Sequence, residues 1–167
     1  NDGSGAFGTT ITNNAASGSF TVTNGSFDGA DSITLAGSGA ITVNGLVADL
    51  SAATATGAIT INAVDDVSIT TGSAATSISQ DTGKTATVDA EALADGTLLT
   101  TSGAGSFTIT NLLGDLTNSA TGTVALTLDG NDGSGAFGTT ITNNAASGTF
   151  TVTNGSFDGA DSITLAG

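Results

Sequence analysis

Residues 39–70 read GAITVNGLVADLSAATATGAITINAVDDVSIT and contain the same short motif twice. The motif is Gly-Ala-Ile-Thr-(Val/Ile)-Asn, and its copies begin at Gly39 and Gly57. Within each copy apolar and polar residues alternate, which is the pattern of a β-strand with one buried face. A second apolar patch follows each copy, at 46–50 and at 66–69.

Two strands and two turns therefore fill about 18–22 residues, which is the length of one coil of a β-solenoid. Similar alternating runs occur throughout the rest of the chain, at 10–13, 20–24, 33–35, 86–89, 107–111 and 124–128. Gly, Asn and Asp separate the runs, and these residues favour turns. We predict an all-β fold, a parallel β-helix that continues through the whole chain. The helix-like stretch 89–94 is too short for more than a turn.

The chain also repeats on a longer scale, because residues 1–37 recur as residues 131–167 with one difference, Ser19 against Thr149. We divide the chain into 1–37, the remainder of a 130-residue period at 38–130, and the start of the next period at 131–167. Such duplication is typical of arrays in which neighbouring repeats bury one another's apolar faces.

The period predicts the dimensions of the solenoid. It holds six or seven coils, and a period is roughly 30 Å long at ~4.8 Å per coil. A whole number of coils would present every copy on the same face. We expect Phe7, Phe20 and Phe27 to be the bulkiest core side chains, and their packing to recur in the second copy at 137, 150 and 157.

A tandem immunoglobulin-like β-sandwich is the alternative fold, with one sandwich and a linker in each period. The many short, equivalent strands speak against it. So does the scarcity of large core residues, since the chain has seven Phe and no Trp or Tyr.

The charge is strongly acidic, with 15 Asp and Glu against one basic residue, Lys84, and a net charge of −14. Nucleic-acid binding requires Lys and Arg to replace counterions, so we exclude it. Binding to anionic membranes is disfavoured for the same reason, and no apolar run is long enough for membrane insertion. An acidic surface rich in oxygen ligands favours Ca²⁺, although solubility explains it equally well.

Two segments suggest where Ca²⁺ would bind. Residues 28–37, DGADSITLAG, are similar to a degenerate calcium-binding β-roll nonapeptide, and residues 129–133, DGNDG, cluster oxygen ligands. The candidate ligands, including those of the second copy, are Asp28, Asp31, Asp129, Asp132, Asp158 and Asp161. The alternative is that these Asp-Gly pairs are turns that join strands.

Catalysis finds little support, because the chain has no His, Cys, Arg or Tyr. We therefore predict that it is not an enzyme and that it has no cofactor other than possible Ca²⁺. Thr-x-Thr pairs recur at Thr10/Thr12, Thr21/Thr23, Thr85/Thr87, Thr108/Thr110, Thr140/Thr142 and Thr151/Thr153. Stacked on a flat face they would order water, as in ice-binding solenoids, or simply stabilise the sheet.

Residues 57–70 (GAITINAVDDVSIT) and 105–118 (GSFTITNLLGDLTN) resemble the repeat regions of giant bacterial surface proteins such as filamentous-haemagglutinin-type adhesins. The resemblance implies a right-handed parallel β-helix, export from a bacterium, and a role in an extracellular fibre, stalk or adhesin. It also implies self-association along the fibre or end to end, and contacts with other cell-surface or matrix components.

Overall fold

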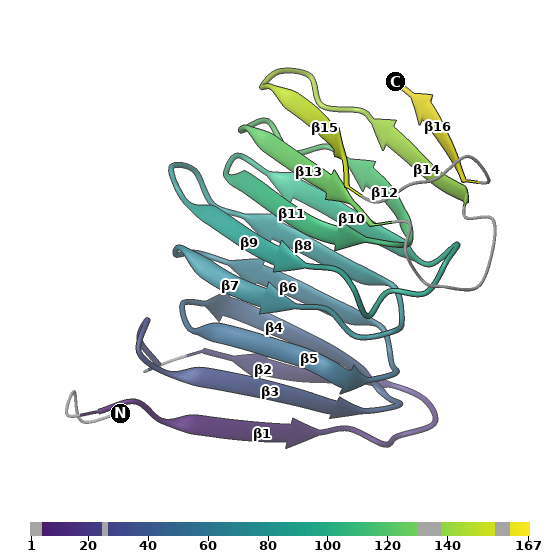
Figure 1. Cartoon of the computed structure of the whole chain (residues 1–167). Coiled ribbons are helices and arrows are strands. Elements are labelled where there is room, and N and C mark those ends of the chain that lie inside the picture. The colour runs from purple at the N-terminus through teal and green to yellow at the C-terminus, as the bar shows by residue number, and fades with distance from the viewer. Residues whose placement is uncertain (1–4, 25–26, 130–137, 156–160) are drawn as a thin grey trace.

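The computed structural model describes residues 5–24, 27–129, 138–155 and 161–167, and within these ranges the chain forms sixteen strands and no helix. The strands make two eight-stranded sheets, and every pairing between neighbours is parallel. Successive strands alternate between the sheets, so one strand from each makes a coil of a two-sided β-solenoid with about 7 turns (Figure 1). The predicted fold class is thus confirmed.

We call the two sheets the odd sheet and the even sheet, after the numbers of their strands. The odd sheet contains β1 (Gly8–Thr12), β3 (Ser32–Gly37), β5 (Asp49–Ala55), β7 (Val67–Thr70), β9 (Thr85–Asp89), β11 (Ser106–Leu112), β13 (Val124–Leu128) and β15 (Phe150–Asn154). The even sheet contains β2 (Ser19–Thr23), β4 (Ala40–Leu46), β6 (Ile59–Ala63), β8 (Thr76–Gln80), β10 (Leu98–Gly103), β12 (Asp115–Asn118), β14 (Gly138–Asn143) and β16 (Ser162–Ala166).

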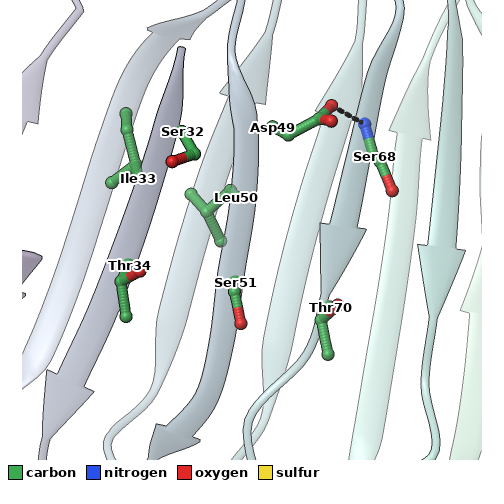
Figure 2. Close-up of a pocket in the computed structure, with 8 residues that line it drawn as sticks. All are labelled: Ser32, Ile33, Thr34, Asp49, Leu50, Ser51, Ser68 and Thr70. Carbon is green, nitrogen blue, oxygen red and sulfur yellow. Dashed lines mark hydrogen bonds between the residues drawn. The ribbon is translucent and has the colours of Figure 1, made fainter. Parts of the chain in front are cut away.

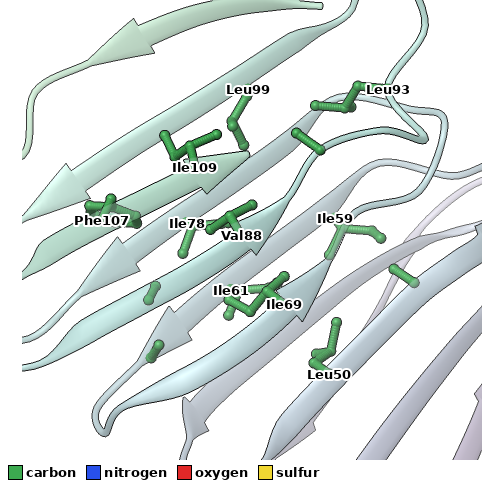
Figure 3. Close-up of a cluster of buried hydrophobic side chains, with 14 of the residues drawn as sticks. Leu50, Ile59, Ile61, Ile69, Ile78, Val88, Leu93, Leu99, Phe107 and Ile109 are labelled. Atoms are coloured by element: carbon green, nitrogen blue, oxygen red, sulfur yellow. The ribbon is translucent and has the colours of Figure 1, made fainter. Parts of the chain in front are cut away.

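The core is a set of aliphatic columns that run along the solenoid axis between the sheets (Figure 3). Inward side chains of the odd strands stack in register in one such column: Ile33, Leu50, Ile69, Val88, Ile109 and Leu126. Each of these is at most 2% exposed. Branched side chains suit this stacking, because they pack well against their neighbours on a pleated surface.

The aromatic core differs from the prediction. Phe107 is the largest fully buried side chain, whereas Phe7 and Phe20 are 49% and 50% exposed. The reason is position, because the first coil is covered on one side only. Phe27 and Phe150 are partly buried against the core, and positions 137 and 157 lie outside the described residues.

Glycines allow the coils to stack closely at the corners. Gly57, which opens the second copy of the motif, lies so close to the coil before it that an added Cβ would overlap the Gly39 carbonyl oxygen. Gly103 has a φ of 93°, which favours glycine, and a Cβ there would overlap the Gln80 carbonyl oxygen. The recurring Gly therefore marks a turn in which two backbones touch.

Coil lengths vary more than predicted. Thr101 and its register partner Asn118 are 17 residues apart, whereas Asn118 and its own partner on the next strand, Asn143, are 25 residues apart. The longest coils are those that contain the duplicated segment. The stretch 89–94 is a turn closed by a hydrogen bond from the Leu93 N–H to the Ala90 carbonyl, as predicted.

Counted over the strands of the described residues, the period does not contain a whole number of coils, contrary to expectation. β1, β2 and β3 of the first copy correspond to β14, β15 and β16 of the second, an advance of thirteen strands. Thirteen strands make six and a half coils, since each coil contains two strands. Each copied strand therefore lies in the opposite sheet from its original: β1 is in the odd sheet and β14 is in the even sheet.

Candidate functional site

The outer face of the even sheet carries one continuous column of hydroxyl side chains. Its members occupy equivalent positions on consecutive strands, and each is in register with the next: Thr21, Thr42, Thr60, Ser77, Thr100, Thr117 and Thr142. Strand spacing sets the distance between neighbouring hydroxyls at ~4.8 Å. Beside this column the Asn62 amide donates a hydrogen bond of 2.6 Å to the Asn44 side-chain oxygen. The result is a regular, polar surface.

The outer face of the odd sheet is less regular. Figure 2 shows a shallow hollow over β3, β5 and β7, lined by Ser32, Ile33, Thr34, Asp49, Leu50, Ser51, Ser68 and Thr70. Here a carboxylate interrupts the hydroxyls, because Asp49 is in register with Ser32. Ala125 interrupts them again between Thr108 and Thr151. Hydroxyls are common on both faces, but only the even sheet has a column of them that continues over seven consecutive strands, from β2 to β14, before Ala166 ends it on β16.

The Thr-x-Thr pairs do not stack into a double column within the described residues. On β9 and β11, Thr87 aligns with Thr108, but Thr85 aligns with Ser106. On β14 and β16, Thr140 aligns with Thr164, but Thr142 aligns with Ala166. Neighbouring strands therefore share one threonine position, and the second position holds another residue.

Aspartates at the starts of strands act as hydrogen-bond acceptors between coils. The Asp49 carboxylate accepts the Ser68 N–H at 2.8 Å, and the Asp66 carboxylate accepts the Thr85 N–H at 2.7 Å. Asp115 accepts the Thr140 N–H at 2.7 Å in the same way. Sequence reasoning did not identify this role. Its signal was present, however, as an Asp at or immediately before the first residue of an apolar run.

The predicted calcium ligands include one aspartate with a clear structural task. Asp31 is 2% exposed, and its two carboxylate oxygens accept hydrogen bonds of 2.9 Å from the Phe7 and Asp28 N–H groups. Asp28 accepts the Ala30 N–H at 2.9 Å, which is the geometry of a turn. These bonds favour the turn interpretation for residues 28–31.

The other predicted ligands are placed less completely. Asp129 and Asp161 are described, and both make interactions of their own. Asp132 and Asp158 lie outside the described residues. Within the described part of the chain, no group of three or more acidic side chains gathers to hold a metal ion. Calcium binding stays a prediction.

The single basic residue joins two adjacent corners of the solenoid. The Lys84 ammonium makes a short ion pair with Asp65 and lies 3.9 Å from an Asp66 oxygen. Its hydrogen bond lowers the pKa of Asp65 below the ordinary value of 3.8, and the same bond raises the pKa of Lys84 above 10.5. Nearby, the buried Gln80 side chain donates to the Asp65 carbonyl at 2.9 Å. These contacts link two adjacent coils, and we call the cluster of Lys84, Asp65, Asp66 and Gln80 the Lys84 clamp.

One further hollow lies at the last described coil. It is lined by Ile141, Asn143, Phe150, Val152, Leu165 and Ala166. Among the described residues, no helix has the length and apolar character needed to cross a membrane.

Comparison of the chain with protein-family models, with curated proteins and with solved structures finds no match. The functional argument therefore depends on the fold, the two faces and the ends of the stack.

Proposed function

We propose that this chain is a structural repeat segment of an extracellular bacterial fibre, stalk or adhesin, in which stacked coils extend the reach of the whole protein. One observation carries the proposal: the described strands of both copies of the duplicated segment belong to the same stack, in parallel register with the coils between them. Length therefore grows by repetition, and each added period needs no new kind of contact.

The surface supports the same role. The flat faces are covered by small hydroxyl side chains, and the acidic side chains at the strand starts bond neighbouring coils. A net charge of −14 keeps such segments soluble. The resemblance to filamentous-haemagglutinin-type repeats, an extracellular bacterial location, and self-association or contacts with surface components belong to this proposal.

Small-angle X-ray scattering tests the spacer role. We expect a rod, and we expect a chain lengthened by one 130-residue period to gain about 31 Å in maximum dimension, since six and a half coils stack at ~4.8 Å. The radius of gyration of the cross-section should stay constant. A lengthened chain whose cross-section grows, while its maximum dimension does not, would contradict the proposal.

The unbroken hydroxyl column of the even sheet favours ice binding as a second candidate function. Regular hydroxyls on a flat, rigid face can hold an ordered layer of water. We expect Thr60→Lys, in the middle of the column, to abolish any inhibition of ice recrystallisation. Thr87→Lys is the matched control, because Thr87 is also exposed but lies on the odd sheet. Equal loss in both variants, or no inhibition by the unmodified chain, would refute this candidate.

A further inference from the structure

Only one peptide bond of the chain follows a basic residue. Lys84 is the single Lys or Arg in the sequence, so the bond between Lys84 and Thr85 is the one bond that a trypsin-like protease can recognise. Such a protease binds the basic side chain in a pocket that contains a carboxylate. Cleavage of this chain by the whole specificity class therefore depends on the accessibility of a single bond.

The side chain that the protease must bind is already bound within the stack. The Lys84 ammonium pairs with Asp65 and lies 3.9 Å from an Asp66 oxygen. Asp65 thus occupies the position that the carboxylate of the protease pocket would have to take. Only 38% of the Lys84 side chain is exposed, and this ion pair must break before the side chain can enter the pocket.

Both backbone groups of the bond are also engaged. The Thr85 N–H donates a hydrogen bond to the Asp66 carboxylate at 2.7 Å, and the Lys84 carbonyl accepts the Ser106 N–H at 2.8 Å. The next coil lies directly against this carbonyl, since a Cβ added at Gly105 would be 2.8 Å from its oxygen. The carbonyl that the protease nucleophile attacks is therefore approached on one side by the neighbouring coil.

The strand that follows the bond has no free edge. An extended peptide is often bound through its free backbone groups, as an added strand. β9 begins at Thr85 and pairs with β7 on one side and with β11 on the other. Residues 81–83 are exposed in the turn before Lys84, but opening of this turn alone would leave Thr85 in the ladder. Cleavage therefore requires β9 to open in the interior of the stack.

We propose that the Lys84 clamp conceals the one bond that a trypsin-like protease can cut in this chain, and that the segment therefore resists this class of protease. The concealed reaction adds water across the bond between Lys84 and Thr85, which leaves a carboxylate on Lys84 and a free amine on Thr85. This role goes beyond the spacer function and does not depend on it. It accounts for the placement of the only basic side chain beside two aspartates of the adjacent coil.

Limited proteolysis with trypsin tests whether the bond is concealed. Asp95→Lys adds a second basic residue in an exposed turn, at residues 94–96, so one molecule then offers both bonds to the same enzyme. At a low trypsin concentration, cleavage follows the open population of each site, and mass spectrometry identifies the fragments. We expect cleavage after position 95 to be faster than cleavage after Lys84 by roughly tenfold or more.

The same variant unfolded in urea is the positive control, because both bonds must be cut there. Cleavage of the folded variant after Lys84 at an equal or higher rate would overturn the inference. If neither bond of the folded variant is cut, the protection does not belong to the Lys84 bond in particular, and the inference is also overturned.

Variants of the clamp test how the bond is concealed. Asp66→Ala removes the acceptor of the Thr85 N–H, and cleavage after Lys84 should become about fivefold faster, the factor that corresponds to one hydrogen bond. Asp65→Ala removes the ion pair and should have a smaller effect, because exposed ion pairs are weak. Asp49→Ala is the matched control, since it removes the same kind of bond between a carboxylate and an N–H group, from β5 to β7.

We expect the rate of cleavage in Asp49→Ala to stay close to that of the unmodified chain, because β9 keeps all of its contacts. Equal acceleration in Asp49→Ala and Asp66→Ala would mean that general unfolding exposes the bond. No acceleration in Asp66→Ala would mean that the clamp does not conceal it. Either result would overturn the inference.

Discussion

Asp49 and Ser68 are 19 residues apart in sequence, yet one carboxylate oxygen of Asp49 accepts the Ser68 N–H at 2.8 Å. The same contact recurs with other aspartates at strand starts. Parallel strands leave an N–H group at each strand start that the ladder does not always satisfy, and a short carboxylate reaches it. Asp49, Asp66 and Asp115, among the 15 acidic residues, thus bond neighbouring coils.

We expect Asp49→Ala to lower the free energy of unfolding by about 1 kcal/mol, because the Ser68 N–H loses its acceptor. For a chain of this size, that is a fall in melting temperature of about 2–4 °C. Circular dichroism measures the shift. Asp95→Ala, in an exposed turn, serves as the control and should melt like the unmodified chain. Equal melting of all three chains would contradict the role of Asp49.

The Lys84 clamp predicts a defined pH dependence. The lowered pKa of Asp65 means that its contribution is present above pH 3.8 and disappears as the pH falls through the folded-state value. The raised pKa of Lys84 means that its contribution is present below pH 10.5 and disappears as the pH rises through its folded-state value.

We therefore expect Lys84→Met to melt at a lower temperature than the unmodified chain at pH 7, by a small amount, because exposed ion pairs are weak. The two melting temperatures should converge once the pH is below the pKa of Asp65. Melting curves from pH 2 to pH 9 measure the difference. A constant difference across this range would show that Lys84 stabilises the fold by packing alone.

At the scale of the element, alternation and turn residues predicted most of the strands, but β10 and β12 lie outside the alternating runs that were recognised. The motif at Gly39 and Gly57 opens β4 and β6, and the Thr of each motif points outward from the sheet. The alternation that indicates a strand occurs within a few consecutive residues, so it can be recognised in the sequence. Burial within a given coil also depends on the coils on either side, and for this reason the pattern did not distinguish Phe107 from Phe20.

This difference gives a matched pair of variants. Phe107→Ala should cost about 3–5 kcal/mol, because the buried ring leaves a cavity between the sheets. Phe20→Ala should cost about 1 kcal/mol or less, since half of that side chain is already in water. Urea unfolding measures both values. Equal losses would mean that the terminal coil is as well packed as the middle of the stack.

At the scale of the molecule, the number of coils in a period could not be predicted from the sequence. One coil advances the chain by 17 residues, from Thr101 to Asn118, and the next by 25 residues, from Asn118 to Asn143. With such variation, the length of the period is compatible with six, six and a half or seven coils. The hydroxyl column of the candidate site could not be predicted from the sequence either. Hydroxyl side chains were evident in the sequence, but the column on the even sheet depends on the register of seven strands.

Distances between spin labels check the half coil. Labels at Thr21 and Thr142, both on the even sheet, should be about 29 Å apart, which is six strand spacings. Labels at Thr21 and its copy Thr151 should be clearly farther apart, because the vector also crosses two sheets about 10 Å apart. Double electron–electron resonance measures both pairs. If the distance between Thr21 and Thr151 did not exceed the axial rise of six and a half strand spacings, about 31 Å, both copies would lie on one face.

The odd number of strands in the period also affects how this chain can evolve. When a thirteen-strand unit is duplicated, each strand of the copy lies in the opposite sheet from its original. A substitution that was fixed before the duplication therefore occurs on both sides of the rod. A surface optimised for one ligand would then be inherited back to back, and one molecule could bridge two partners. The gain or loss of a single strand would make the number of strands in a period even. Every copy of a given surface would then lie on the same side of the rod.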